Sequence, residues 1–383
     1  MSKIAKIEVF RVPPRWLMVR VETEDGIVGW GEGTLEGHTE AVEGAYEDLR
    51  TRFVGFDANR IETIWQEAYR HRFYRGGPVL MSALSGLDIA LWDIKGKRLG
   101  VPVYDLLGGR VRDRVNVYSW VHGTPKDVGE QAEIRKRQGF TRVKMGGPER
   151  INWMDSSRVL EETVERLKVV REAGIDAGID FHGRVHKGMA KLLADQLAPF
   201  RPLFIEEPLL PENLHGFKQL ANLTSIPIAT GERLFNRWEC KPYFESGAID
   251  IIQPDLAHCG GISEARRIAA MAEAYDIALA PHCPLGPIAL AACMHIDLAS
   301  QNFFVQEMSV PINYDDRSKG DLDLLSYCKD PTVFEVKNGA IEAFTKPGLG
   351  VEVDEDLVRR VAITAKPWRN PVLYGSDGSI QEW

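Results

Sequence analysis

Residues 177–232 decide the fold, because they hold three short apolar runs that each end in an acidic residue: Ala177-Gly-Ile-Asp180, Leu203-Phe-Ile-Glu206 and Ile228-Ala-Thr-Gly-Glu232. The three acids follow one another at equal intervals of 26 residues. Each run is typical of a buried strand, and one strand-plus-helix unit of an eight-stranded barrel takes about 31 residues. The spacing therefore predicts one carboxylate at the carboxyl end of each of three successive strands, where such barrels keep their active sites.

The strand pattern extends on both sides of this stretch. From Val115 onward, apolar runs alternate with helical stretches, and we predict eight strands at residues 115–121, 140–145, 177–181, 203–207, 227–232, 249–254, 277–282 and 303–308. Eight such repeats favour a closed parallel α/β barrel of the TIM type. The alternative is a doubly wound open sheet, which would be expected to carry a glycine-rich phosphate loop after its first strand; the sequence has none there.

Two segments flank the predicted barrel. Residues 1–114 show strand patterns followed by helical ones, which is typical of an α+β domain. We place the barrel at residues 115–320 and a separate carboxyl-terminal segment at residues 321–383. That segment is polar, is interrupted by Pro and Gly, and holds Trp368 and Trp383. We expect it to return to the amino-terminal domain.

Composition excludes several classes of protein. The chain has 383 residues, a formal net charge of −8 and a pI near 5.7, whereas nucleic-acid binders carry basic surfaces. Its five cysteines lack CxxC spacing, so we expect reduced thiols and a cytoplasmic location. The amino terminus has no signal-type apolar stretch, and no run of 18 apolar residues predicts a membrane span.

Asp180, Glu206 and Glu232 would repel one another in a low-dielectric cleft unless a cation lay among them. No Cys or His belongs to the set, and oxygen ligands are those that Mg²⁺ prefers. We therefore predict a Mg²⁺ site. Glu207 lies beside Glu206, and only one of the two can point into the barrel because strand side chains alternate. The residues alone leave that choice open.

Two histidines lie near these acids in the predicted barrel. Alternation along the strand means that an inward Asp180 brings His182 inward as well. Asp255 and His282 end consecutive predicted strands, which lie about 4.8 Å apart. A carboxylate so placed can accept the imidazole N–H and raise the basicity of the other ring nitrogen, so His282 is a candidate general base. The alternative for each histidine is a purely structural role.

Glu307 and Lys144 end two further predicted strands, the eighth and the second. Burial among other acids would raise the pKa of Glu307 and allow it to donate a hydrogen bond; a surface salt bridge is the alternative. Lys144 would neutralise a substrate carboxylate, or else lie solvated at the barrel rim.

Together these groups predict an elimination. A metal ion held by three carboxylates can stabilise the charge that forms when a substrate carboxylate loses its α-proton. His282 would take that proton, and a protonated His182 would give one to a departing β-hydroxyl. The predicted reaction converts a 2,3-dihydroxy acid into a 2-keto-3-deoxy acid. No Gly-x-Ser-x-Gly elbow or Cys–His pair indicates nucleophilic catalysis.

Several motifs, taken together and in their order along the chain, resemble those of the enolase superfamily. The resemblance is to its mandelate racemase-like branch, and within that branch mostly to the members that dehydrate galactonate. The motifs are Pro13-Pro-Arg-Trp, Phe73-Tyr-Arg-Gly-Gly-Pro, Leu91-Trp-Asp-Ile-Lys-Gly-Lys, Gly178-Ile-Asp-Phe-His-Gly-Arg, Phe204-Ile-Glu-Glu-Pro, Gly231-Glu-Arg, Gln253-Pro-Asp-Leu and Ala280-Pro-His-Cys-Pro-Leu-Gly-Pro-Ile-Ala. The resemblance covers nearly the whole chain. It implies a modified (β/α)7β barrel and a capping domain built from the amino terminus and the carboxyl-terminal tail.

The resemblance also implies roles for individual residues. The expected Mg²⁺ ligands are Asp180, Glu206 and Glu232, which selects Glu206 over Glu207. The expected catalytic residues are His282 as base, Asp255 as its support, His182 as acid and Glu307 as a stabiliser of the enolic intermediate. The expected substrate-binding residues are Lys144 and, in loops that close over the substrate, Arg15, Trp16 and Tyr74. A symmetric homo-oligomer is also implied.

The second predicted strand departs from the racemases of this superfamily, which have Lys-x-Lys where this chain has Lys144-Met-Gly146. Without the second Lys there is no base on the opposite face, which favours one-base elimination over racemisation. The similar galactonate dehydratases look as though they carry Asn where this chain has Gly146. D-galactonate is the first expected substrate; gluconate, mannonate or a deoxy aldonate is the alternative within the enzyme class. A catalytically silent scaffold on the same fold is the alternative outside it.

Overall fold

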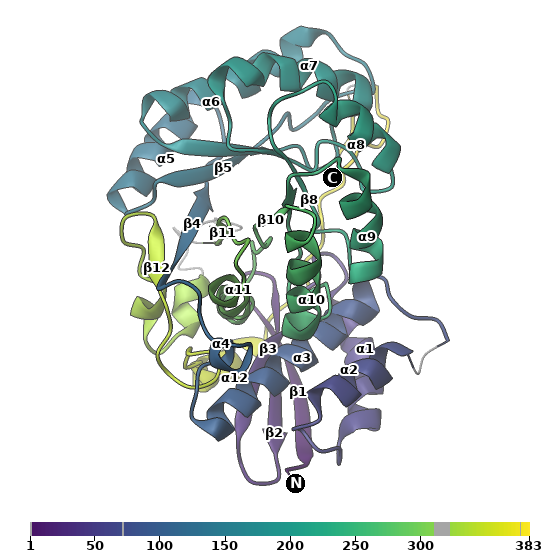
Figure 1. The fold of residues 1–383 in the computed structure, drawn as a ribbon, viewed down its shortest axis with the longest axis vertical. Helices are drawn as coiled ribbons and strands as arrows, with labels where there is room; N and C mark the ends of the chain where they lie inside the picture. The colour runs from purple at the N-terminus through teal and green to yellow at the C-terminus, as the bar shows by residue number, and fades with distance from the viewer. Residues whose placement is uncertain (1, 71–72, 310–321, 376) are drawn as a thin grey trace.

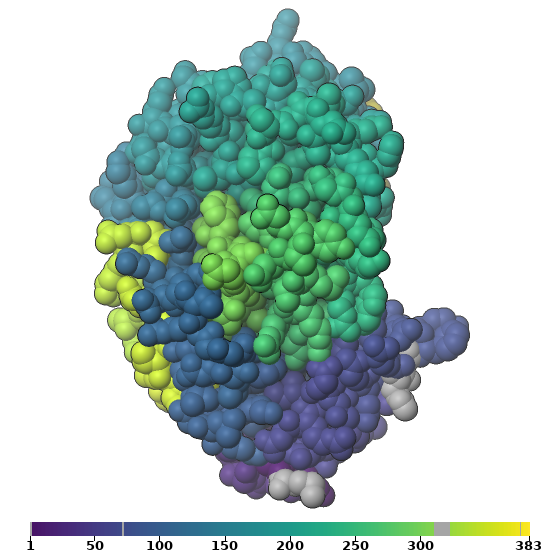
Figure 2. Space-filling model, viewed as in Figure 1, coloured from purple at the N-terminus to yellow at the C-terminus, as the bar shows by residue number. Residues whose placement is uncertain are grey.

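The computed structural model describes residues 2–70, 73–309, 322–375 and 377–383 (Figure 1). A barrel of parallel strands lies on an amino-terminal capping domain, which confirms the expected fold class. Figure 2 shows the teal-to-green barrel in direct contact with the purple-to-blue capping domain. The expected division at residues 320 and 321 lies outside the described residues.

The capping domain combines one antiparallel sheet with helices. Its strands pair in the order β1 (Ile4–Val12), β2 (Trp16–Thr23) and β3 (Val28–Glu32). Its helices are α1 (Thr39–Phe53), α2 (Ile61–Arg70), α3 (Pro78–Leu99) and the short α4 (Val103–Leu106). The strands come before the helices, as the sequence predicts.

Helix α3 joins the capping sheet to the barrel. It is apolar on nearly every face and packs so closely on β3 that a Cβ added at Gly31 would lie 1.8 Å from the carbonyl oxygen of Gly86. On its other side, Trp92 Nε1 donates to Ser263 Oγ of the barrel over 2.9 Å. These contacts fix the position of the capping domain on the barrel.

Within the described ranges, eight parallel strands form the barrel. They are β4 (Arg114–Trp120), β5 (Arg142–Gly146), β6 (Asp176–Asp180), β7 (Ile205–Glu206), β8 (Ile228–Thr230), β9 (Ile251–Ile252), β10 (Ala278–Leu279) and β11 (Gln306–Glu307). They pair in sequence order, and β11 returns to pair with β4. A bridge between Leu279 and Phe303 closes the remaining gap. Each predicted strand is present, and the later ones are shorter than predicted.

One α-helix follows each of the first seven barrel strands in the described part of the chain. They are α5 (Pro125–Arg137), α6 (Glu161–Glu172), α7 (Lys187–Leu197), α8 (Leu214–Ala221), α9 (Arg237–Ser246), α10 (Gly261–Glu273) and α11 (Pro287–Ala299). This is the (β/α)7β arrangement. Figure 1 shows α5 to α10 around the outside of the strands. Among the described residues, no helix is both long and apolar enough to cross a membrane.

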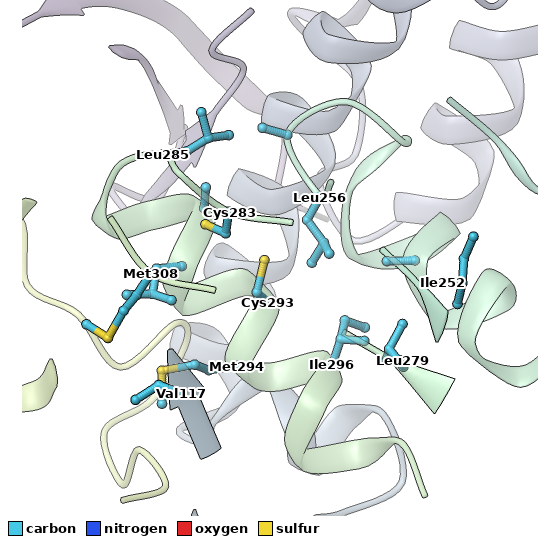
Figure 3. Close-up of a cluster of buried hydrophobic side chains, with 14 of the residues drawn as sticks. Val117, Ile252, Leu256, Leu279, Cys283, Leu285, Cys293, Met294, Ile296 and Met308 are labelled. Carbon is cyan, nitrogen blue, oxygen red and sulfur yellow. The ribbon is translucent and has the colours of Figure 1, made fainter. Parts of the chain in front are cut away.

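Helix α11 is the most buried of the barrel helices. Figure 3 shows Cys293, Met294 and Ile296 of this helix among side chains from the strands, including Ile252 and Leu279. All five are at most 1% exposed. The residues that follow β10 and β11 therefore start from a rigid, close-packed base.

The carboxyl-terminal segment returns to both domains. Strand β12 (Ala340–Glu342) pairs antiparallel with β4, and helix α12 (Glu355–Ala362) packs on β1. Arg20 Nε lies 3.1 Å from Glu355 Oε1, and Arg359 lies 3.2 Å from Glu8. The tail therefore contacts the amino-terminal domain through α12.

Candidate active site

The three acids identified by their spacing lie together at one mouth of the barrel. Asp180 ends β6 and Glu206 ends β7, and these two residues are direct partners in the parallel register. Glu232 follows the end of β8 by two residues. One oxygen from each carboxylate lies within 4.8 Å of the other two. The barrel thus gathers side chains that are 26 residues apart in the sequence.

The chemistry of this carboxylate triad fits a divalent cation. Asp180 Oδ2 and Glu232 Oε2 are buried and accept no hydrogen bond from any described residue. Burial raises the pKa of Glu232 to about 7, and burial together with the charge of Asp180 raises the pKa of Glu206 well above its usual range. A cation would favour the ionised forms, and an all-oxygen donor set suits an ion such as Mg²⁺.

Lys144 lies inside the carboxylate cluster and is fully buried, which excludes a solvated position at the barrel rim. Its Nζ lies 2.5 Å from Glu206 Oε1, 3.0 Å from Glu307 Oε1 and 3.3 Å from Asp180 Oδ2. Burial alone would lower the pKa of Lys144, but these carboxylates raise it well above its usual value. Lys144 therefore carries a positive charge beside the triad.

Glu206 and Glu207 point to different surroundings. Glu207 accepts a hydrogen bond from Thr230 Oγ1 over 2.6 Å and forms an ion pair with Arg233, outside the triad. Its backbone φ of +41° turns the chain after β7. Glu206 is the one of the two whose carboxylate belongs to the cation-sized cluster.

His282 and Asp255 form a hydrogen-bonded pair. His282 Nδ1 lies 2.8 Å from Asp255 Oδ2, and His282 Nε2 lies 3.2 Å from Glu232 Oε2. Burial would lower the pKa of His282, but Glu232 and Glu307 raise it well above its usual value. A cation on Glu232 would weaken that effect and so bring the imidazole towards the neutral form that a base requires.

His182 reaches the triad by a different route from the one predicted. Strand β6 ends at Asp180, and His182 has a left-handed backbone with φ of +52°, so strand alternation does not place its side chain. Instead, the His182 amide donates to Asp180 Oδ1 over 2.9 Å, and His182 Nδ1 lies 3.3 Å from the same oxygen. Burial lowers the pKa of His182 to about 4, which favours the neutral imidazole near pH 7 over the protonated form expected from the sequence.

Glu307 is buried, and its surroundings favour the ionised form over the protonated hydrogen-bond donor expected from the sequence. Burial would raise its pKa, but Lys144 and His282 lower it. Its Oε1 accepts from Trp120 Nε1 over 2.5 Å, and its Oε2 accepts from the Cys283 amide over 2.9 Å. Full burial also excludes the alternative of a surface salt bridge.

A cavity of about 440 Å³ opens above the triad. The barrel, the capping domain and the tail all line it, with Arg15, Glu36, Trp120, His122, His182, Arg184, Glu232, His282, Pro284, Trp368, Asn370, Pro371 and Trp383. Both histidines therefore face one space. Its volume suits a small polar molecule.

The structure brings only one of the three expected loop residues to this cavity. Arg15 lines it and lies 3.1 Å from Glu36. Trp16 is 2% exposed and packs edge-on against Tyr327 with ring centroids 5.7 Å apart, because it begins strand β2 and faces the core. Tyr74 is 85% exposed and is not among the residues that line the cavity.

Nine lining residues were not predicted as site residues, and they include Trp120, Arg184, Glu36 and Trp383. Trp120 ends β4 and Arg184 follows His182 by two residues, so position near a strand's carboxyl end was an available signal for both. Glu36 in the capping domain and Trp383 in the tail carried no such signal. Their place depends on how distant parts of the chain pack.

Two family matches cover most of the chain. Residues 127–357 match the enolase C-terminal domain-like family, and residues 12–108 match the mandelate racemase / muconate lactonizing enzyme N-terminal domain. The chain is 50% identical over 385 aligned positions to proteins named D-galactonate dehydratase from Ralstonia pickettii (strain 12J) and Xanthomonas euvesicatoria pv. vesicatoria (strain 85-10). Each alignment covers 100% of both chains.

Solved structures show the same architecture. An enolase from Agrobacterium radiobacter with bound sodium and L-malate is 34% identical, with a TM-score of 0.90 and coverage of 99% of each chain. A mandelate racemase/muconate lactonizing enzyme from Sulfitobacter sp. is 32% identical, with a TM-score of 0.88 and coverage of 98% of this chain and 99% of that one.

Proposed function

We propose that this chain, which belongs to the enolase superfamily and is a hydro-lyase for a sugar acid, is a Mg²⁺-dependent dehydratase of D-galactonate. The observation that carries the proposal is the position of two imidazoles at opposite ends of one carboxylate triad, His282 beside Glu232 and His182 beside Asp180. The 50% identity to proteins named D-galactonate dehydratase supports the choice of substrate.

Asp180, Glu206 and Glu232 would hold the Mg²⁺ ion. When bound there, the ion would stabilise the substrate carboxylate and the extra negative charge that develops on it as the α-proton leaves. Lys144 adds a fixed positive charge beside the triad. Glu307 holds Lys144 and accepts from the Trp120 N–H, so it orients the surroundings of the carboxylate.

His282 removes the proton from carbon 2 of the substrate. Asp255 accepts from Nδ1, which leaves Nε2 as the basic nitrogen, and Nε2 is the atom that faces Glu232 and the cavity. The pair therefore fixes both the tautomer and the direction of proton transfer.

His182 gives a proton to the hydroxyl that leaves carbon 3. Because burial lowers its pKa to about 4, the imidazolium is a minor form near pH 7, and it transfers its proton readily once formed. Loss of the hydrogen from carbon 2 and of the hydroxyl from carbon 3 yields water and an enol, which takes up one proton at carbon 3 as it becomes the 2-keto-3-deoxy acid.

The test is a 2-keto-acid assay with Mg²⁺ over a panel of aldonates and aldarates, run with the wild type and His282→Asn. We expect D-galactonate to react fastest and the variant to be inactive. Turnover of no member, or unchanged activity in His282→Asn, would contradict the dehydratase mechanism. Gluconate or mannonate reacting orders of magnitude faster would overturn only the choice of substrate.

A further inference from the structure

The tail that follows α12 spans the cavity from the capping domain to the barrel. Arg369 forms an ion pair with Glu40 of α1. The chain then folds into a tight hairpin, in which the Gln381 amide donates to the Leu373 carbonyl over 3.0 Å. These contacts bring Trp383 into the wall of the cavity.

Arg184 lines the same wall, and one nitrogen of its guanidinium has no hydrogen-bond partner. Its Nε is buried without a hydrogen-bond partner, and within the described ranges no side chain forms a salt bridge with it. Its guanidinium carbon lies 5.4 Å from the centre of the Trp383 ring. By contrast, Arg15 and Arg233 at the same mouth are paired with Glu36 and Glu207. A buried donor without a partner is costly, so Arg184 is suited to acceptor oxygens of a ligand.

Two indoles lie close to His182. Trp120, with its ring centroid 6.0 Å away, is also 4.6 Å from Lys144 and therefore marks the carboxylate side of His182. Trp383, with its centroid 5.8 Å away, marks the side of Arg184. If His182 serves the hydroxyl on carbon 3, carbon 4 follows on the side of Arg184 and Trp383.

We propose that Arg184 and Trp383 form the subsite that distinguishes sugar acids by the configuration of their carbon-4 hydroxyl. Arg184 donates to that hydroxyl's oxygen, and the Trp383 indole packs against the C–H face of the chain. D-galactonate and D-gluconate differ at carbon 4 alone, so this subsite sets the preference between them. The inference rests on the proposed function, because it uses His182 to place carbon 3.

The test compares kcat/KM for D-galactonate and D-gluconate in the wild type, Arg184→Gln and Trp383→Ala. We expect Arg184→Gln to lower kcat/KM for the preferred epimer about 100-fold and the other far less, so that the ratio collapses. Trp383→Ala should reduce the ratio, and Trp383→Phe should largely keep it. Arg137→Gln, an exposed change on α5, is the matched control and should leave both values unchanged.

The two proposals fail separately. No turnover of any aldonate by the wild type would overturn the proposed function. An epimer ratio in Arg184→Gln within about threefold of wild type would overturn the subsite. Where nothing turns over, the same ratio is taken from calorimetric affinities of the two aldonates with Mg²⁺ present. Equal wild-type binding of both epimers would also overturn the subsite.

Discussion

His282 Nδ1 lies 2.8 Å from Asp255 Oδ2, and Asp255 is 1% exposed, three residues after the end of β9. The carboxylate therefore fixes one tautomer of the imidazole and stabilises its protonated form. Asp255→Asn should lower kcat by about 10²–10⁴, with a much smaller change in substrate affinity. Steady-state kinetics and calorimetry check this. Unchanged kcat in a folded variant would show that the pair is structural.

His182 can be separated from His282 by hydrogen exchange. His182→Asn removes the proposed acid but leaves the base, so the substrate should still exchange its carbon-2 proton in D₂O while product formation falls by about 10²-fold or more. NMR follows both signals in one sample. His282→Asn is the comparison and should lose exchange and product together. Loss of exchange in His182→Asn would mean that His182 is needed for proton removal.

The carboxylate triad should bind Mg²⁺ and stabilise the fold. At 100 times its Kd, an ion that binds only the folded state adds about 2.7 kcal/mol to the free energy of unfolding. Mg²⁺ should therefore raise the melting temperature of the wild type, EDTA should reverse this, and Glu206→Gln should abolish it. Glu207→Gln, beside the triad but outside it, should keep the Mg²⁺ effect. If Glu207→Gln abolished the Mg²⁺ effect and Glu206→Gln kept it, Glu207 and not Glu206 would be the ligand.

Asp88 should make stability depend on pH at the junction of the domains. It accepts hydrogen bonds from the amide and hydroxyl of Ser263, and burial raises its pKa to about 7 from the ordinary value of 3.8. Between these values the folded chain keeps a proton that the unfolded chain releases, so stability falls as pH rises from about 4 to 7. One such group contributes at most about 1.4 kcal/mol per pH unit.

Urea unfolding between about pH 4 and 7 measures how steeply the free energy of unfolding falls with pH. Asp88→Asn should make this slope shallower without abolishing it, because burial also raises the pKa of Glu32 to about 7. Asp195→Asn, an exposed change on α7, is the control and should leave the slope unchanged. An identical slope in wild type and Asp88→Asn would contradict the predicted titration.

The sequence predicts the barrel and its triad because both follow from a local repeat. Each βα unit fixes where its strand ends, so Asp180, Glu206 and Glu232 can be located from spacing alone. His182 was predicted near the triad for the wrong reason, since a left-handed turn sets its position. Such a turn is a single backbone choice that hydrophobic patterns do not encode.

Other parts of the site depend on contacts between distant segments. The pKa of Glu307 is lowered by Lys144, which lies 3.0 Å away, and strand assignment alone does not reveal this contact. Trp383 contacts His182, although 200 residues separate them in the sequence, and the tail that carries Trp383 has little hydrophobic periodicity. Trp16 and Tyr74 lie in motifs that indicate a family, but packing decides which loop residues face the cavity.

The most direct measurement of the proposed chemistry is NMR of D-galactonate with the wild type and Mg²⁺ in D₂O. Removal of the carbon-2 hydrogen and loss of the carbon-3 hydroxyl, followed by tautomerisation, predict a 2-keto-3-deoxy acid with one deuterium at carbon 3. No product should form with EDTA or in His282→Asn. Recovery of unchanged D-galactonate with Mg²⁺ present, or equal product in His282→Asn, would contradict the mechanism.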